Sequence, residues 1–297
     1  MIKTVIIGGS TPVAGELIRI LINHPDVDII QVQSNENIGR AVADIHTGLI
    51  GETELKFTSV ADVTKADMVF VCDCSPVPHV TDEQRVVCFF PPETDKEKYV
   101  YGLPDMNRKS MVRGARRVVI PSAQAMLTML ALLPLARNLM LKGKIDILLG
   151  LPATITDYVV VDELMRELAT QQNNLDIDLN LCTKRLSAER VMTVRCCLDL
   201  GIDTAELDRI YNENYDDHNF TFRINRLPLN ADVEGTNKCL IHLKRCDDGR
   251  LDVHAAFDAV VKGNAGTAVH CMNLLFGLHE LTGLALKASR LGWDVID

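Results

Sequence analysis

The stretch that decides the fold is Thr4-Val5-Ile6-Ile7-Gly8-Gly9-Ser10-Thr11-Pro12-Val13-Ala14-Gly15, close to the N-terminus. An apolar run ends at two glycines, and residues 16–21 then place apolar side chains at helical spacing. This pattern predicts a buried strand, a tight turn and a helix. Further short apolar runs, at residues 27–32, 68–71, 86–89 and 118–120, alternate with helical stretches. Such alternation predicts an α/β domain with a doubly wound parallel sheet, covered on both faces.

The second half of the chain has a different pattern. Residues 126–141 predict one apolar helix, and helices are also expected at residues 158–170, 204–211 and 266–276. Longer strands are expected at residues 145–151, 175–181, 191–198, 238–244 and 251–260. The last two are joined by Cys246-Asp247-Asp248-Gly249-Arg250, a hairpin turn signal. The pattern therefore predicts a second, α+β domain with a mixed sheet that begins near residue 122.

Length and composition limit the class of protein. The chain has 297 residues, about enough for two domains. With 47% hydrophobic and 24% charged residues, it is typical of globular proteins rather than disordered or collagenous ones. It has 31 Lys and Arg against 40 Asp and Glu, a net charge of −9, and no basic run. This charge pattern argues against a nucleic-acid partner.

The apolar stretches, the N-terminus and the cysteines of the sequence predict a cytoplasmic protein with free thiols. The longest apolar stretches, such as residues 126–136, are much shorter than the roughly 20 residues that cross a bilayer. The N-terminus enters a strand directly, so we expect no secretory signal and no membrane partner. Nine cysteines are an odd number, and they form no paired C-x-x-C hooks. We therefore expect no metal site and no disulfide framework, but free thiols in a reducing compartment.

The first turn only partly matches a Rossmann dinucleotide-binding turn. Gly8 meets the need for a sharp bend, but Thr11 adds bulk and Pro12 removes an N–H where a pyrophosphate would approach. The carboxylate that usually holds a ribose hydroxyl after the second strand is also absent, because residues 33–35 are Gln, Ser and Asn. Two interpretations stay open: residual nucleotide binding, or a turn that merely connects two elements.

The other chemically reactive residues have ordinary structural explanations. Cys72 and Cys74 lie two apart near a strand end, which predicts side chains on one face, toward the carboxyl-end crevice of the sheet. A reactive thiol stays open as an alternative, but small buried apolar groups are favoured. The adjacent Cys196 and Cys197 should face opposite sides of their strand and so cannot hold one metal together. His79 and His270 are expected to be structural. The pair at residues 216–217, two aspartates, fits a solvated loop.

Taken together, several segments resemble the N-acetyl-gamma-glutamyl-phosphate reductase family of the semialdehyde dehydrogenase superfamily. The resemblance covers nearly the whole chain. It is carried by residues 15–21 with 23–25, 66–70, 101–108 and 233–237, and most specifically by Val261-Lys262-Gly263-Asn264-Ala265-Gly266-Thr267-Ala268-Val269 running on to residues 272–278. In the family, that last stretch lines the nicotinamide pocket before a C-terminal helix packs back on the nucleotide domain.

The resemblance implies a reaction, but the chain departs from its motifs. The family reduces an acyl phosphate: a cysteine thiolate at a helix N-terminus releases phosphate, and the thioester accepts hydride from NADPH. The motif Asn-Pro-Gly-Cys-Tyr falls on residues 120–124, so Ala123 stands at the nucleophile position. The catalytic histidine should fall near residues 154–158, yet no histidine occurs between His79 and His218. No catalytic residue of the family motifs is therefore expected to be intact.

Three further departures concern substrate and cofactor. The Gly- and Arg-rich substrate segment is shortened to residues 150–153. Glu234 replaces a usual arginine, and Asn35 replaces the arginine associated with NADPH. Because nucleophile, proton carrier, anion site and cofactor site all change, the pattern indicates a chain released from the family reaction. Ser122 is a weak substitute nucleophile without a base beside it.

The resemblance also implies an architecture and a set of site residues. Residues 1–122 with 266–297 would form the Rossmann-like domain, and residues 123–265 the α+β domain, whose sheet would make a homodimer or homotetramer. The expected cofactor is NAD(P), bound weakly or no longer bound. The residues expected around it are Gly8, Ser10, Thr11, Pro12, Val13, Ser34, Cys74, Ser75, Ser122, Asn264 and Gly266.

Three functions follow from this resemblance. The favoured one is a divergent relative that no longer catalyses the thiol-dependent reduction and binds a metabolite or partner. The alternatives are an active NAD(P)-dependent reductase of arginine biosynthesis, and an interaction scaffold that binds no small molecule.

Overall fold

The computed structural model describes residues 1–76, 78–90, 98–152, 160–188 and 190–288. The chain divides into two compact units. The first comprises Met1–Pro121 with Asn264–Ala285, and the second comprises Ser122–Gly263 with residues 286–288. Residues 286–288 thus group with the second unit, whereas the family resemblance implied that they complete the first.

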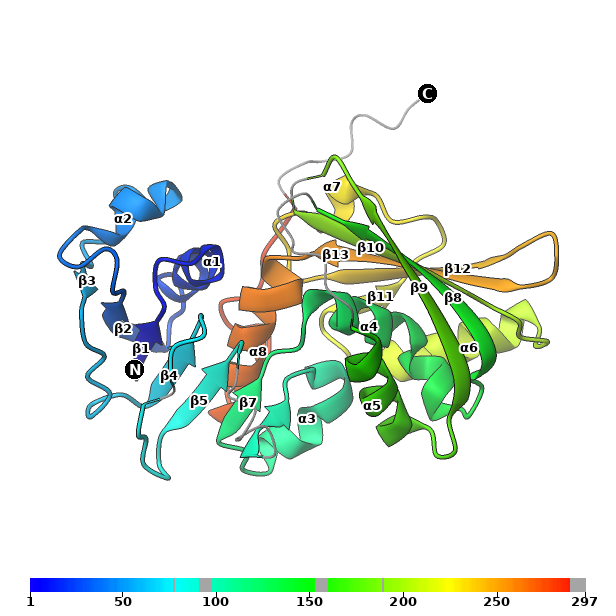
Figure 1. Ribbon diagram of the computed structural model, residues 1–297, viewed down its shortest axis with the longest axis horizontal. Helices are drawn as coiled ribbons and strands as arrows, with labels where there is room; N and C mark the ends of the chain where they lie inside the picture. The colour runs from blue at the N-terminus through cyan, green and yellow to red at the C-terminus, as the bar shows by residue number, and fades with distance from the viewer. Residues whose placement is uncertain (77, 91–97, 153–159, 189, 289–297) are drawn as a thin grey trace. The chain divides into compact units, whose positions relative to one another are not determined.

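The first unit is built on a seven-stranded sheet with the order β3-β2-β1-β4-β5-β7-β6 (Figure 1). All of its strand pairs are parallel. The strands are β1 (Ile2–Ile7), β2 (Val27–Gln33), β3 (Phe57–Thr58), β4 (Met68–Val71), β5 (Arg85–Cys88), β6 (Val100–Tyr101) and β7 (Arg117–Val119). Most side chains of the central strands β1 and β4 are buried. In a parallel sheet covered on both faces, the side chains that point to either face are shielded from water.

Helices cover this sheet and connect its strands. They are α1 (Pro12–Leu21), α2 (Val42–Ile45), the 3₁₀ turn η1 (Thr47–Leu49), α3 (Pro104–Val112) and α8 (Gly266–Leu275). Although α8 comes from the end of the chain, it packs against α1, α3 and β5 of the first unit. The expectation that a C-terminal helix packs on the nucleotide-binding domain is therefore confirmed.

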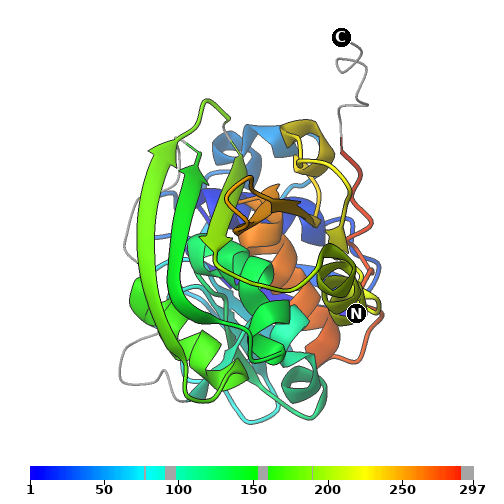
Figure 2. The same ribbon diagram turned by 90° about the vertical axis from the view of Figure 1, so that its right-hand side faces the viewer.

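The second unit is built on a mixed six-stranded sheet with the order β11-β12-β13-β10-β8-β9. Its strands are β8 (Lys142–Leu151), β9 (Asp176–Arg185), β10 (Val191–Leu198), β11 (Thr221–Arg223), β12 (Cys239–Arg245) and β13 (Leu251–Asp258). The pairs β8–β9 and β11–β12 are parallel and the others antiparallel. Figure 2 shows β8 and β9 as two long green strands side by side. The predicted mixed sheet and the hairpin at residues 246–250 are confirmed.

The helices of the second unit are α4 (Ala123–Arg137), α5 (Val161–Gln171), α6 (Thr204–Tyr215) and α7 (Asn230–Val233), and a π-helical turn follows at Val261–Ala265. α4 packs on β10, β12 and β13, and α5 and α6 pack on α4. Figure 1 shows α4, α5 and α6 on one side of the sheet. Every residue from Ala123 to Ala136 is buried, which explains why α4 is apolar on all its faces. No helix in the described part of the chain is long and apolar enough for a membrane span.

The structure corrects several predicted element boundaries. The helix predicted for residues 126–141 runs from Ala123 to Arg137, because Ser122 caps its start and Leu139 adopts a positive φ of 58° after its end. The strands β3, β6 and β11 and the helix α3 were not predicted. These strands have two or three residues and lie at sheet edges, so they carry no alternation to detect. The predicted helix at 158–170 begins partly outside the described residues and is observed as α5.

Candidate functional site

The turn between β1 and α1 requires glycine at two positions. Gly8 has a φ of 72°, and a Cβ there would lie 2.4 Å from Cγ of Asp73. A Cβ at Gly9 would lie 2.2 Å from Cγ1 of Val32. Side chains at these positions would therefore displace β2 or the loop after β4, and the glycines keep the turn tight.

The start of α1 leaves two N–H groups exposed to a ligand. The Thr11 hydroxyl donates to the Gly8 carbonyl (3.0 Å) and accepts from the Ala14 N–H (3.2 Å), so it caps the helix. Pro12 follows at the first helical position, where its missing N–H costs little. Among the described residues, the N–H groups of Ser10 and Val13 have no acceptor. Their place at a helix N-terminus suits an anion such as a phosphate.

His46 is a residue of this turn that the sequence did not reveal. Its Nε2 lies 2.7 Å from the Gly9 carbonyl oxygen, and a Cβ at Gly15 would lie 2.4 Å from its Nδ1. Because Gly15 has no side chain, there is room for the imidazole ring of His46 beside the turn between β1 and α1. Gly15 and His46 are 31 positions apart, and the sequence between them carries no pattern that would have paired them.

Neutral polar side chains form a hydrogen-bond network at the end of β2. The sequence has no carboxylate here of the kind that usually holds a ribose hydroxyl. The Gln33 Oε1 accepts from the Gly8 N–H (3.3 Å), and its Nε2 donates to Asn35 Oδ1 (2.8 Å). The Ser34 hydroxyl donates to Ser10 Oγ (3.1 Å), which brings two of the predicted cofactor residues together. The same loop contains Arg40, an exposed cation bonded to an asparagine side chain. This arginine lies five positions after Asn35, and no sequence motif marks it.

The loop after β4 corrects the prediction for two cysteines. Since β4 ends at Val71, Cys72 and Cys74 lie beyond the strand, and the alternation that would place them on one face does not apply. Cys72 is buried and Cys74 is exposed. Burial is the main cause that raises the pKa of the Cys72 thiol far above its ordinary value, so it stays a neutral apolar group. Asp73 between them accepts from the N–H of Ser75 (2.8 Å).

In the second unit, the start of α4 places an alanine where the family motif has its cysteine. Ser122 is the N-cap residue and Ala123 is the first helical residue, 5% exposed. The Ser122 hydroxyl accepts from the Ala125 N–H (3.2 Å) and donates to Glu163 Oε2 of α5 (2.8 Å). A carboxylate therefore lies at the helix N-terminus, which favours negative charge. Glu163 is 41 positions from Ser122, so no local sequence pattern indicates the pair. The expectation that no base lies beside Ser122 is therefore wrong, because this carboxylate accepts from its hydroxyl.

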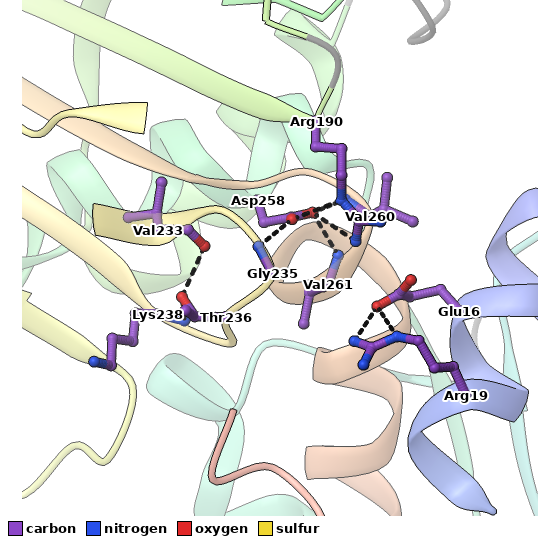
Figure 3. Close-up of polar contacts among 10 residues, drawn as sticks. All are labelled: Glu16, Arg19, Arg190, Val233, Gly235, Thr236, Lys238, Asp258, Val260 and Val261. Atoms are coloured by element: carbon purple, nitrogen blue, oxygen red, sulfur yellow. Dashed lines mark hydrogen bonds and ion pairs between the residues drawn. The ribbon is translucent and has the colours of Figure 1, made fainter. Parts of the chain in front are cut away.

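A buried carboxylate fixes the most specific stretch of the family resemblance. Asp258 at the end of β13 accepts from Arg190 Nε (2.9 Å) and from the N–H groups of Gly235 (2.8 Å), Val260 (2.9 Å) and Val261 (3.0 Å) (Figure 3). It thus ties the turn that begins at Val261 to the 233–237 segment. Gly235 needs its glycine for a φ of 74°. The predicted cofactor residues Asn264 and Gly266 belong to the first unit, Gly266 as the first residue of α8.

The 233–237 segment also holds an unpaired amide. The Thr236 hydroxyl donates to the Val233 carbonyl (2.8 Å) and accepts from the Lys238 N–H (3.2 Å), as Figure 3 shows. Asn237 is 1% exposed, and neither its Oδ1 nor its Nδ2 finds a partner among the described residues. An unmade buried hydrogen bond of this kind costs about 1 to 3 kcal/mol, so native proteins rarely keep one without a use.

The remaining predicted residues are placed as follows. The His270 Nε2 lies 2.7 Å from Glu280 Oε2 in a buried pair, and His79 is exposed. Glu16 accepts from its neighbour Arg19 on α1 (Figure 3), which is a local helix pair. Residues 153–159, where the family histidine and the end of the shortened substrate segment were expected, lie outside the described residues.

Comparison with known proteins identifies the family. Residues 3–86 match the family described as semialdehyde dehydrogenase, NAD binding domain. A protein from Parabacteroides distasonis named N-acetyl-gamma-glutamyl-phosphate reductase is 35% identical over 322 residues, covering 97% of this chain and 99% of the relative. The chain belongs to this reductase family. A second reductase of that name, from Bacteroides thetaiotaomicron, is 32% identical over the same share of both chains.

Solved structures show the same semialdehyde dehydrogenase fold. Aspartate semialdehyde dehydrogenase II from Vibrio cholerae superimposes with a TM-score of 0.71 at 12% identity, covering 93% of this chain and 98% of that chain. The enzyme from Candida albicans, solved with NADP, gives a TM-score of 0.68 at 11% identity. The predicted family and the predicted fold class are both confirmed. The alignment with the Parabacteroides reductase spans more positions than this chain has residues, so that relative holds residues that this family member lacks.

Proposed function

We propose that this chain is a divergent member of the reductase family, without the thiol-dependent reduction of an acyl phosphate, that binds a metabolite or a partner. The observation that carries the proposal is Ala123 at the start of α4. A helix N-terminus lowers the pKa of a cysteine placed there and so produces a thiolate. An alanine methyl offers no nucleophile, and the family reaction cannot begin.

The neighbouring serine does not replace the missing thiol. The Ser122 hydroxyl already caps α4 and donates to Glu163, so both its hydrogen and a lone pair are engaged in the structure of the helix start. A serine would in addition form an ester with the substrate, and an ester accepts hydride less readily than a thioester. The Ser122–Glu163 pair therefore supports a structural role for Ser122.

The first turn supports retained binding of NAD(P). The residues present fit a dinucleotide in one respect: the unpaired N–H groups of Ser10 and Val13 at the start of α1 suit a phosphate. Gly8 and Gly9 keep side chains away from that place. NAD(P), when bound, supplies or accepts a hydride. The neutral network of Gln33, Ser34 and Asn35 offers hydrogen bonds but no charge to the ribose, which favours weak binding.

The unpaired amide of Asn237 favours a metabolite over a pure scaffold. A buried donor and a buried acceptor without partners are the groups that a polar ligand satisfies on binding. Asn237 belongs to the segment in which Glu234 replaces an arginine that is usual in the family. A scaffold that binds no small molecule has no need for such a group in its interior.

The runner-up is an active NAD(P)-dependent reductase, which the family name and the nearly complete coverage favour. A thermal-shift panel with NADP, NAD and acetylated amino-acid phosphates separates these functions. A ligand at 100 times its dissociation constant stabilises by about 2.7 kcal/mol. A shift with an acetylated metabolite that is lost in Asn237→Ala supports metabolite binding, whereas no shift with any of these compounds supports the scaffold.

A further inference from the structure

The side of the second sheet opposite α4 carries a cluster of two cysteines and an aspartate. Cys197 lies on β10, Asp252 on β13, and Cys246 directly after β12. The register pairs Cys197 with Asp252, so the two side chains lie on the same face. Their two sulfur atoms and one carboxylate oxygen all lie within 4.8 Å of one another.

One oxygen of this cluster is buried and poorly satisfied. Asp252 is 5% exposed, and its Oδ2 accepts from Arg195 Nε at 2.7 Å. Its Oδ1 has no N–H or O–H donor among the described residues. The thiols of Cys197 and Cys246 are weak donors to this carboxylate. A buried carboxylate oxygen served by such weak donors is unfavourable, and a cation beside it would remove the penalty.

We propose that Cys197, Cys246 and Asp252 bind a borderline-soft divalent metal ion such as Zn²⁺, with solvent as the fourth ligand. Two sulfurs and a carboxylate oxygen are the ligand types that Zn²⁺ takes in proteins. In a tetrahedral site with Zn–S bonds of about 2.3 Å, two sulfurs lie about 3.8 Å apart. The observed separations of 4.8 Å or less therefore need a contraction of about 1 Å at most.

The strand order favours a metal bridge over a disulfide. β13 lies between β10 and β12, so their backbones are two strand spacings apart, about 9 to 10 Å. A disulfide needs Cα atoms within about 7 Å of each other. A metal ion reaches further, because two Zn–S bonds replace one S–S bond.

The charges around the cluster permit a divalent ion. Burial first, and then the Asp252 carboxylate, raise the pKa of Cys197 to about 11, and hydrogen bonding to Asp252 also raises the pKa of Cys246. Binding exchanges two thiol protons for one divalent cation, which leaves the net charge of the cluster unchanged. Of the nearby cations, Arg250 pairs with Asp248 (2.8 Å) outside the cluster. Arg195 pairs with Oδ2 of Asp252 itself, which leaves Oδ1 for the ion.

A pocket beside Cys197 provides access. Its volume is about 280 Å³, and besides Cys197 its lining includes Asp146, Arg195 and Arg250. Water from this pocket would complete the coordination. The resulting site would fasten the β12–β13 hairpin to β10. The sequence showed no such site because its ligands come from three separate strands, without C-x-x-C spacing.

Titration of the full, metal-free chain with Co²⁺ under a thiol reductant tests the proposal, with Zn²⁺ displacing the Co²⁺ afterwards. We expect one Co²⁺ per chain, a thiolate charge-transfer band, the visible spectrum of a tetrahedral site, and release of about two protons per ion. Cys246→Ser should weaken binding by more than the 10- to 100-fold typical for loss of an outer-shell partner. Asp252→Asn should also weaken it.

The matched control is Cys182→Ser, because Cys182 is an exposed cysteine of the same pocket and is not one of the three proposed ligands. It should bind as the unmodified chain does. Cys246 is half-buried in a turn, so its variant remains informative even if Cys197→Ser fails to fold. The proposal is overturned if no Co²⁺ binds, if binding survives both Cys246→Ser and Asp252→Asn, or if Cys197 and Cys246 prove to be joined as a disulfide. None of these readouts depends on NAD(P) or on turnover.

Discussion

At the residue scale, two neighbours at the start of α4 determine what this chain can do chemically. Ala123 removes the nucleophile, and Ser122 is bound in a cap and in a hydrogen bond to Glu163. The helix N-terminus still carries the partial positive charge that would stabilise a thiolate. Residue 123 therefore carries no thiol, while the helix N-terminus that would stabilise a thiolate is present.

Restoring the thiol alone should not restore the reaction. Ala123→Cys places a sulfur at the first position of α4, but no histidine between His79 and His218 is available to move the proton. We expect the variant to react with iodoacetamide at residue 123 and still show no phosphate-dependent reduction of NADP with N-acetylglutamate semialdehyde. A turnover that appears on this single change would show that the rest of the catalytic site is intact.

Removing the cap should destabilise the second unit. Ser122→Ala deletes the hydroxyl that accepts from Ala125 and donates to Glu163. Loss of an N-cap side chain costs about 0.5 to 2 kcal/mol, so the free energy of unfolding should fall by that amount in urea. The control is Ser110→Ala, an exposed serine within α3, which should change stability little. Equal effects for both would mean that the Ser122 contacts contribute nothing.

At the element scale, the β1–α1 turn and the loop after β2 differ in the groups that they offer to a nucleotide. The glycines of the turn, its capped helix and its two unpaired N–H groups are those of a phosphate-binding turn. The loop after β2 has instead become a neutral network. The turn and the loop therefore point to binding of the pyrophosphate without strong recognition of the ribose.

The turn should not tolerate a side chain at Gly8. A Cβ at that position combines a φ of 72° with an approach of 2.4 Å to Asp73 Cγ. A left-handed conformation alone costs about 1 to 2 kcal/mol for a residue with a side chain, so we expect Gly8→Ala to lower the unfolding free energy by at least that much. The control is Gly48→Ala, where a Cβ meets nothing within 4 Å. It should be neutral or stabilising, and the reverse order of the two variants would contradict the structure of the turn.

The loop after β2 should leave the chain without a preference for NADP. Asn35 stands where the family has an arginine, and a charge-assisted contact to the 2′-phosphate contributes about 1.5 to 3 kcal/mol. Calorimetry should therefore give similar affinities for NAD and NADP. If NADP binds clearly more tightly, the prediction is wrong, and Arg40→Ala would show whether the exposed arginine of the same loop supplies the contact.

The elements show which parts of the fold a sequence reveals. The central strands and the capped helices could be predicted, because long apolar runs and cap residues act locally. The edge strands β3 and β6 could not, since two residues carry no periodicity. The contacts of His46 with Gly9 and of Glu163 with Ser122 were also beyond prediction, because they join residues 37 and 41 positions apart.

At the scale of the whole molecule, the chain keeps the family architecture over nearly its full length. Both units and the C-terminal helix that packs on the first unit are present, and Asp258 still anchors the turn at Val261. The Parabacteroides reductase is longer than this chain. At the position of the family's nucleophilic cysteine, this chain has Ala123. We propose that the chain retains the family architecture without the thiol-dependent reduction.

The most direct test of that claim is an assay of phosphate-dependent NADP reduction with N-acetylglutamate semialdehyde. The unmodified chain should be purified from a host that lacks its own reductase, and the Parabacteroides distasonis relative should be measured beside it. We expect the relative to turn over and this chain to show no rate above a mock preparation. A rate comparable with that of the relative, proportional to the amount of this chain, would contradict the account.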